Sequence, residues 1–455
     1  MMRRTIWSSL LLTCVLCAAC SQPTTKPEAD ATPPSYRTAA QESGELVWAS
    51  SFDETNSSGD PIYAAIADVQ VDSDGSVFVL GVEQSYSPFS IDFGMVDDAT
   101  ILKFDSDGAK AEATFSIEAS EALLVDSEGD LYAVGWSEGW EADDPDELLI
   151  YKIAAERDRA WCRTIEMPDG KGFLSGASTV VRAAIDADDN IYVVAEVAAR
   201  LSPSAGRGAK WRRSIVFTKL DSEAEALWQV ELASEEDDYC FDIAISEDGE
   251  LYLVGMTEGE LFGENAGGRD TFIAKYDSEG AALWGKQMGT SGDDKLESVC
   301  VGDDGRIYTA GSTNGTMGDA PIGGRDVLLM AFDAAGGVTW TRQFGTIDND
   351  RALAIAFAPS GGIYVGGHTR GAMRGSITGS VDIFLGKYDA QGQELWVEQV
   401  GRRGRPDELY GMVAKENFLY VIGKAGGDLL DGALPRGPFL MKYQTRVGDA
   451  SDPGE

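Results

Sequence analysis

One sequence block recurs along this chain at a fixed interval, and this repetition constrains the fold more than any other feature. The segment AKYDSEGAALWGKQMGTSGDD (274–294) is followed 56 residues later by MAFDAAGGVTWTRQFGTIDND, and after another 56 by GKYDAQGQELWVEQVGRRGRP. Copies of the block are marked by a tryptophan: Trp48, Trp161, Trp228, Trp284, Trp340 and Trp396. A period near 57 residues is typical of propeller blades and not of helical repeats.

A second landmark gives the number of repeats. Short apolar runs of the form I-Y-V-x-G occur seven times, and they end at Gly81, Gly135, Ala195, Gly255, Gly311, Gly367 and Gly423. Within one repeat, the runs 270–277, 282–288, 295–305 and 306–311 have strand composition and are separated by Gly, Asp and Ser turns. The pattern predicts an all-β protein, a seven-bladed β-propeller of four-stranded antiparallel blades.

The two ends of the repetitive region predict how the ring closes. Residues 44–52 (GELVWASSF) contain a tryptophan strand without the strand that precedes it elsewhere, and residues 437–444 (GPFLMKYQ) form a K-Y strand without its tryptophan strand. We therefore expect the last blade to be closed by strands from both termini, which removes an open sheet edge.

The repeat unit 267–313 resembles the bacterial seven-bladed β-propeller repeat family, often called the SBBP repeat. The resemblance is strongest over 267–423 and weaker over 44–266; residues 103–116, for example, lack the tryptophan. It implies a propeller fold and an extracytoplasmic setting. It carries no catalytic residues that could be transferred to this chain.

The N-terminus predicts the destination of the chain. Arg3 and Arg4 precede a short apolar stretch that ends in CAAC, which fits a secretory signal peptide (1–19). The ending resembles a bacterial lipoprotein processing site with lipid (palmitate) on Cys20, although ordinary cleavage is an alternative. Ser21 resembles an outer-membrane sorting residue, and the periplasmic or surface side stays open. We expect a disordered tether (20–43), the propeller (44–447) and a disordered tail (448–455).

The chain is strongly acidic, with a formal net charge of −39, and this charge disfavours nucleic acid and anionic membranes as partners. Many acidic residues lie in D-x-x-G segments, where Asp and Gly fit tight turns. Calcium binding is the alternative, because these segments resemble the start of a calcium loop but lack the later glutamate. The weak calcium candidates are Asp293, Asp294, Asp348 and Asp350; no other cofactor is expected.

Catalytic chemistry has little support in the sequence. Beyond the leader, Cys162, Cys240 and Cys300 show no metal-ligand spacing, and we expect them to be buried small side chains. The single histidine, His368, has no matched partner for a zinc site or a triad. We therefore predict that the chain is not an enzyme.

Loop parity predicts a working face. Short turns alternate with long connections along the antiparallel blades, so the long connections gather on one face, where function concentrates. Arg269 and Arg325 recur in GGRD, which favours a structural pairing with carboxylates. Non-recurring basic residues are better binding candidates for an anionic group, with local charge balance as the alternative: Arg212, Arg213, Arg402, Arg403 and Arg405.

Together these features predict an envelope-tethered propeller lipoprotein that acts as a binding or scaffold module through its long-loop face. Its partners would be envelope proteins or glycans, and we expect a monomer. Two alternatives remain: a scaffold for outer-membrane assembly, and a hydrolase or lyase that acts on polysaccharide.

Overall fold

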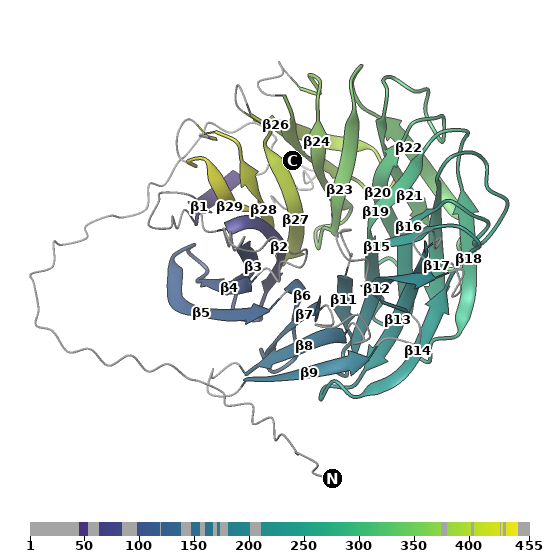
Figure 1. The fold of residues 1–455 in the computed structure, drawn as a ribbon. Helices are drawn as coiled ribbons and strands as arrows, with labels where there is room; N and C mark the ends of the chain where they lie inside the picture. Colours follow the sequence, from purple (N-terminus) through teal and green to yellow (C-terminus); the bar gives the residue numbers. More distant parts are fainter. Residues whose placement is uncertain are drawn as a thin grey trace, which may run out of the picture. The chain divides into compact units, whose positions relative to one another are not determined.

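The computed structural model describes residues 45–52, 63–83, 98–118, 120–137, 147–154, 160–166, 171–172, 181–200, 211–374, 380–401, 405–427, 429–430 and 434–444. They belong to one compact unit, Tyr36–Glu455. The described strands form seven antiparallel sheets arranged as blades around a central axis (Figure 1). The all-β, seven-bladed propeller predicted from the repeat is confirmed.

Each blade runs from the axis outward through four strands. The innermost strands are β2 (Tyr63–Val71), β6 (Ser120–Val125), β11 (Val181–Ile185), β15 (Asp238–Ile245), β19 (Asp294–Val301), β23 (Asp350–Phe357) and β27 (Glu408–Lys415). The second strands are β3 (Val77–Glu83), β7 (Leu131–Ser137), β12 (Ile191–Arg200), β16 (Leu251–Thr257), β20 (Ile307–Thr313), β24 (Ile363–Thr369) and β28 (Phe418–Ala425).

The outer half of each blade completes the sheet. The third strands are β4 (Asp98–Phe104), β8 (Glu147–Ile153), β13 (Trp211–Leu220), β17 (Asp270–Tyr276), β21 (Asp326–Phe332), β25 (Asp382–Tyr388) and β29 (Gly437–Gln444). The outermost strands are β5 (Lys110–Glu118), β9 (Ala160–Glu166), β14 (Ala226–Leu232), β18 (Ala282–Met288), β22 (Val338–Phe344), β26 (Glu394–Val400) and β1 (Glu45–Ser51). A short extra strand, β10 (Lys171–Gly172), pairs with β12.

The blades are numbered in chain order, from blade 1 (β2–β5) through blades 2 (β6–β9), 3 (β10–β14), 4 (β15–β18), 5 (β19–β22) and 6 (β23–β26) to blade 7 (β27–β29 with β1). A folded blade begins two strands later than the repeat unit read from the sequence. The unit 267–313 therefore contributes its K-Y and tryptophan strands to blade 4 and its other two strands to blade 5.

Blade 7 is built from both ends of the chain. Strand β1 pairs with β29 in antiparallel register, with Leu46 opposite Tyr443, Trp48 opposite Lys442 and Ser51 opposite Phe439. Figure 1 shows β1 beside β29 at the junction of the purple and yellow ends of the colour scale. The predicted closure is confirmed.

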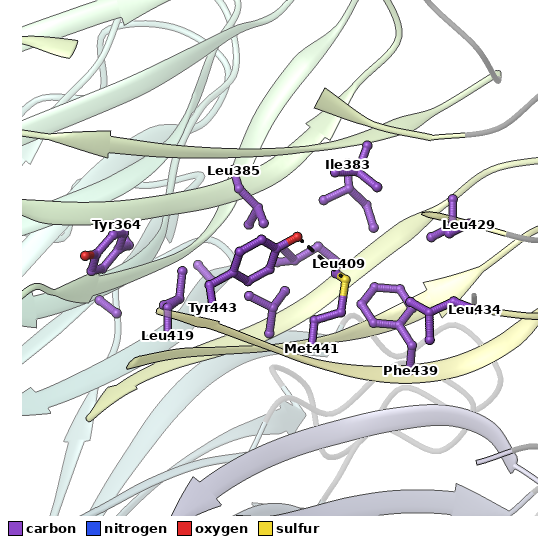
Figure 2. Packing of buried hydrophobic residues seen from close by; sticks show 14 of the residues in the cluster. Tyr364, Ile383, Leu385, Leu409, Leu419, Leu429, Leu434, Phe439, Met441 and Tyr443 are labelled. Carbon is purple, nitrogen blue, oxygen red and sulfur yellow. Dashed lines mark hydrogen bonds between the residues drawn. The ribbon is translucent and has the colours of Figure 1, made fainter. Parts of the chain in front are cut away.

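Adjacent blades bury recurring aromatic and aliphatic side chains against each other. The largest fully buried side chains are tyrosines of second strands and phenylalanines of third strands: Tyr132, Tyr192, Tyr252, Tyr308, Tyr364, Tyr420, Phe104, Phe217, Phe272, Phe332, Phe384 and Phe439. Figure 2 shows one such interface, where Ile383 and Leu385 of blade 6 face Met441 and Tyr443 of blade 7. Because a single blade cannot cover its own faces, the ring is needed to bury them.

Four of the recurring tryptophans donate a hydrogen bond to a turn of the following blade: Trp48, Trp228, Trp284 and Trp340. Trp284 Nε1 donates to the carbonyl oxygen of Ala334 in the following blade at 3.2 Å, and Lys275 Nζ reaches the same oxygen at 3.3 Å. The ring lies against Gly336, where an added Cβ would come within 3.1 Å of it. The tryptophan that marks each copy of the repeat therefore packs between blades here.

The acidic turns have the local geometry that their sequence predicts. The Asp277 carboxylate accepts hydrogen bonds from the backbone nitrogens of Glu279 (3.1 Å) and Ala281 (2.8 Å), and Gly280 adopts φ +81°. A glycine takes this left-handed conformation without the steric cost of a Cβ. The carboxylate is thereby used inside the turn.

Candidate functional site

The long connections gather at one end of the blades, as loop parity predicts. In blade 5, the turns 302–306 and 333–337 are short, whereas the segments after β20 and after β22 leave from the other end. The same end holds the first residues of inner strands and the last residues of second strands. We call this end the long-loop face.

A cavity of about 270 Å³ opens on the long-loop face where blades 5, 6 and 7 meet. Its lining is rich in arginine: Arg325, Asn349, Asp350, Arg351, His368, Arg370, Val381 and Glu408. We call it the arginine pocket. Its three guanidinium groups outnumber its two carboxylates, so the pocket is a positive site on a chain whose net charge is −39.

Two of these arginines have no charged partner among the residues that the structure describes. Within the described ranges, no hydrogen bond or ion pair engages the guanidinium of Arg351 or of Arg370, and the Arg325 Nε donates to the neutral Asn314 Oδ1 at 2.9 Å. Arginine presents a planar fork of donors that matches a carboxylate, sulfate or phosphate group. The free donors make this pocket suited to such an anion.

At the preceding junction, between blades 4 and 5, the equivalent arginine is paired with a carboxylate. Arg269 holds the position that Arg325 holds in the next blade, and its Nε contacts the Glu258 carboxylate at 2.9 Å. This interaction with Glu258, assisted by Asp293, raises the pKa of Arg269. The predicted pairing of the GGRD arginines with carboxylates is thus confirmed for Arg269; Arg325 instead contacts the neutral Asn314 and has no carboxylate partner in the described ranges, so the prediction is wrong there.

The change from paired to unpaired arginine follows from substitutions within the repeat. Glu258, the residue after β16, becomes Asn314 after β20, and Asp293, the residue before β19, becomes Asn349 before β23. Arg325 and Asn349 keep the backbone bridge that Arg269 and Asp293 form. The backbone arrangement is therefore retained while two negative charges are lost.

The histidine of the pocket is held neutral. Burial, and then the positive charge of Arg351, lower the pKa of His368 to about 4. Its Nε2 accepts a hydrogen bond from the backbone nitrogen of Leu409 at 2.8 Å, which leaves the proton on Nδ1. His368 therefore joins blades 6 and 7 and adds no charge to the pocket at neutral pH.

The two carboxylates of the pocket are engaged elsewhere. Asp350 accepts hydrogen bonds from the backbone nitrogen of Thr346 and from Thr346 Oγ1, the latter at 2.9 Å. Glu408 accepts one from the Tyr410 hydroxyl at 2.7 Å. Neither forms an ion pair with a pocket arginine among the described residues, so the guanidinium donors are not consumed by them.

The structure places the predicted binding arginines 212 and 213 in strand β13 and not in the loop that precedes it. Arg212 Nη1 donates to the carbonyl oxygen of Ser234 at 2.5 Å. Arg213 lies 3.5 Å from Glu196 and its guanidinium covers the Tyr239 ring at 5.0 Å. Arg213 thus contacts both its own blade 3 and the neighbouring blade 4. Both arginines have local partners, in line with the local-balance alternative; their part in binding stays a prediction.

The other predicted arginines lie in the connection into blade 7. Arg405 is exposed and precedes Glu408, which lines the arginine pocket. Arg402 and Arg403 belong to the same connection but lie outside the described residues, as does the lipidation candidate Cys20. The binding role of this basic loop stays a prediction.

The four calcium candidates are not brought together. Asp294 accepts hydrogen bonds from the backbone nitrogen of Thr290 (2.6 Å), from its hydroxyl (2.8 Å) and from Thr313, and Asp350 has the same place in the next blade. Asp293 adjoins Arg269, and Asp348 is exposed. Within the described ranges, no three His, Cys, Asp or Glu side chains form a set able to hold a metal ion.

The axis holds a second cavity, of about 240 Å³, lined by inner strands. Its carboxylates join neighbouring blades: Asp68 accepts from the Leu123 nitrogen at 2.9 Å, and Asp242 accepts from the Val299 nitrogen at 2.9 Å. Burial raises the pKa of Asp68 to about 6 and also raises the pKa of Asp242. We therefore assign these carboxylates a structural role: they hold neighbouring blades together through hydrogen bonds near the axis.

The predicted burial of the cysteines holds for one of the three. Cys240 is buried, Cys300 is half-buried, and Cys162 is exposed. The expectation is wrong for Cys162 because this residue lies on β9, the outermost strand of blade 2, where one face meets solvent.

Comparisons with known proteins leave the family open. No family model matches the chain, so the resemblance to the SBBP repeat stays a prediction beyond the fold itself. The chain is 27% identical over 212 residues to the regulatory protein FlaEY of Caulobacter vibrioides, a match that covers 41% of this chain and 22% of that protein. The chain thus spans less than a quarter of the length of this relative.

Several solved structures are similar to the propeller. The β-propeller domain of the Trilobed protease from Pyrococcus furiosus has a TM-score of 0.45, 11% identity and coverage of 85% of this chain and 99% of that chain. Polysaccharide lyase Uly1 has a TM-score of 0.48, 11% identity and coverage of 85% and 91%. Puromycin hydrolase has a TM-score of 0.47, 15% identity and coverage of 80% and 50%.

These similarities correct one prediction. The inference that the chain is not an enzyme is wrong as drawn, because the chains of similar fold include a polysaccharide lyase and a hydrolase. At identities of 11% and 15% the likeness concerns the fold and assigns no reaction.

In the part of the chain that the structure covers, no helix is long and apolar enough to cross a membrane.

Proposed function

We propose that this chain is an envelope binding module, tethered at the outer membrane by lipid on Cys20, that recognises a compact anionic group in its arginine pocket. The observation that carries the proposal is the set of guanidinium groups of Arg325, Arg351 and Arg370 in one cavity, of which the last two have no charged partner among the described residues. At the preceding junction, by contrast, the equivalent arginine is paired with a carboxylate, Arg269 with Glu258.

The physical case rests on desolvation and geometry. Arg351 is half-buried and Arg325 is partly covered, so their charges are screened less than those of fully exposed side chains. An anion that bridges two guanidinium forks forms charge-assisted hydrogen bonds, which are about twice as strong as neutral ones. The class of ligand is therefore a carboxylate, sulfate or phosphate group.

The test compares two positions of the repeat. We expect the double variant Arg351→Ser/Arg370→Ser to bind acetate and sulfate at least about tenfold more weakly than the natural protein, as measured by calorimetry at constant ionic strength. Arg269→Ser removes a paired arginine from the equivalent place in the preceding blade and serves as the control, with binding expected to be unchanged. Equal binding by all three proteins would refute the pocket.

The same protein separates binding from catalysis. Anionic polysaccharides can be incubated with the natural chain and with the double variant, and their length followed over time. Chain cleavage that the double variant lacks would assign a lyase or hydrolase activity to this pocket. Retention of an intact ligand, or of an outer-membrane protein, supports a binding or scaffold role.

The tether is tested independently. Cys20→Ala should remain unprocessed or become soluble, because the acceptor for the lipid is lost. Fractionation of cells that express this variant and the natural chain decides the question. A variant that still separates with the outer membrane would show that the anchor is not at Cys20.

A further inference from the structure

Two exposed isoleucines stand on the segments that build the arginine pocket. Ile347 is 82% exposed and Ile322 is 54% exposed, which makes them the two most exposed large hydrophobic residues in the described part of the chain. Ile322 precedes Arg325 by three residues, and Ile347 precedes Asn349 by two. The remaining exposed large hydrophobic residues lie on outermost strands: Val47, Leu227, Leu283, Val338 and Leu395.

Contacts between the two segments hold the loops that carry the isoleucines side by side. The backbone nitrogens of Ile322 and Gly323 donate to the Asp326 carboxylate at 2.8 and 3.1 Å. A Cβ added at Gly323 would lie 2.2 Å from the Thr346 carbonyl oxygen, so the loop before β21 lies directly on the loop before β23. Ile322 and Ile347 do not line the pocket itself, but they lie on two adjacent loops that supply Arg325 and Asn349 to it, and we call this pair the isoleucine rim.

The isoleucines do not recur with the repeat. One period earlier their positions are occupied by Ala266 and Ser291, beside the paired arginine Arg269. The unpaired arginines and the isoleucine rim thus occur at the same junction and are both missing from the preceding one. This coincidence points to a ligand that offers an anionic group and an apolar group a short distance apart.

The charge of the chain restricts the ligand further. A polyanion would bring many charges close to a surface whose net charge is −39, and the repulsion would oppose binding. A single anionic group on a neutral or basic partner avoids this repulsion. None of the described residues that line the pocket is Phe, Tyr or Trp, so a sugar ring would find no large aromatic face there.

We propose, building on the proposed function, that the arginine pocket and its isoleucine rim bind the free C-terminal carboxylate of a neutral or basic polypeptide whose last side chain is apolar. The carboxylate accepts hydrogen bonds from Arg351 and Arg370, and the last side chain contacts Ile322 and Ile347. A polypeptide C-terminus carries both groups on one residue, which matches the adjacency of the two features. Capture of a terminal carboxylate is a known mode of peptide recognition.

The test uses the full mature chain and three synthetic peptides. Gly-Lys-Gly-Ser-Val with a free carboxylate is compared with the same peptide ending in an amide and with Gly-Lys-Gly-Ser-Gly with a free carboxylate. We expect the first to bind at least about tenfold more tightly than the amide, measured by calorimetry. Ile347→Ser should weaken binding of the valine peptide several-fold and leave the glycine peptide unchanged, whereas Arg351→Ser/Arg370→Ser should weaken both.

The outcomes separate this inference from the proposed function. Equal binding of the acid and the amide, or failure of all peptides while acetate and sulfate still bind in an Arg351-dependent manner, would overturn the inference and leave the anion site in place. Failure of peptides and small anions alike would overturn both. Preference for a polyanionic glycan over the valine peptide would also overturn the inference.

Discussion

Trp48 and Lys442, which lie at opposite ends of the described chain, donate hydrogen bonds to the same carbonyl oxygen. Trp48 Nε1 lies 3.1 Å from the oxygen of Ser106, and Lys442 Nζ lies 3.0 Å from it. The two donors are paired neighbours on β1 and β29, and Ser106 belongs to the turn between β4 and β5. The interaction that recurs between successive blades thus also closes the ring between blade 7 and blade 1.

Deletion of residues 437–455 tests this closure. The truncation removes β29, so β1 and β28 lose their shared partner and an apolar blade edge becomes exposed. We expect aggregation, or a fall of the melting temperature by roughly 10 °C or more. Deletion of 448–455 alone is the control and should leave the melting temperature unchanged. A stable, monomeric 437–455 deletion would mean that the ring does not depend on the shared blade.

Gly392→Ala tests the docking of tryptophan on the next blade. Gly392 has φ +72°, and an added Cβ would come within 2.9 Å of the Trp340 ring. Gly305 has the same φ, but nothing lies within 4 Å of the added atom. We expect Gly305→Ala to lower the free energy of unfolding by about 1–2 kcal/mol because of its left-handed φ, and Gly392→Ala to lower it by about 1–3 kcal/mol more because of the clash. Equal losses, measured by urea unfolding, would contradict the docking.

Glu196→Gln tests a buried carboxyl beside Arg213. Burial raises the pKa of Glu196 to about 8, although Arg213 opposes the shift. The folded state therefore binds a proton that the unfolded state releases at lower pH. The associated stability is complete below about pH 4.5 and is lost as the pH rises through about 8.

The natural protein should accordingly lose stability between pH 5.5 and 8.5 to a greater extent than Glu196→Gln. The difference can reach several kcal/mol, because one pKa unit corresponds to about 1.4 kcal/mol. Urea unfolding at both pH values measures it, with the exposed residue Glu279, changed to Gln, as the control. Parallel curves for the natural protein and Glu196→Gln would show that Glu196 ionises normally.

Anion binding by the arginine pocket should be independent of pH between about 5.5 and 8. The pKa of His368 is lowered to about 4, so this imidazole remains neutral across the range and its charge does not change. Calorimetry across this range measures the dependence. Since His368 is the single histidine of the chain, tighter binding as the pH falls through 6.5 would indicate that its proton takes part, and His368→Asn would then abolish the trend.

The propeller could be predicted almost completely because its determinants are local and repeated. The turn at Asp277 to Gly280, the apolar runs such as that ending at Gly311, and the tryptophan of each copy specify strands and turns through residues only a few positions apart. Seven copies can bury the faces of all their sheets when they form a closed ring, in which each blade covers a face of the next. Because the K-Y strand at residues 437–444 has no tryptophan strand after it, the sequence even predicts that this strand pairs with β1.

The arginine pocket could not be predicted in this way, although its signal was present in the sequence. Replacement of Glu258 and Asp293 by Asn314 and Asn349, one period later, is visible when the repeats are compared. Its meaning depends on which side chains surround Arg325. The recurrence of Arg269 and Arg325 in the same motif instead suggested the same structural role for both.

The sequence by itself determined the number of blades, the order of their strands and the closure by both termini, because hydrophobic period and turn chemistry act over short distances. Only the tertiary structure decided where a blade begins and which arginines meet. Arg325 comes from blade 5, and Arg351 and Arg370 come from blade 6. Glu408, which also lines the pocket, comes from blade 7. Proximity between blades is set by the packing of one sheet on the next, which no stretch of sequence encodes alone.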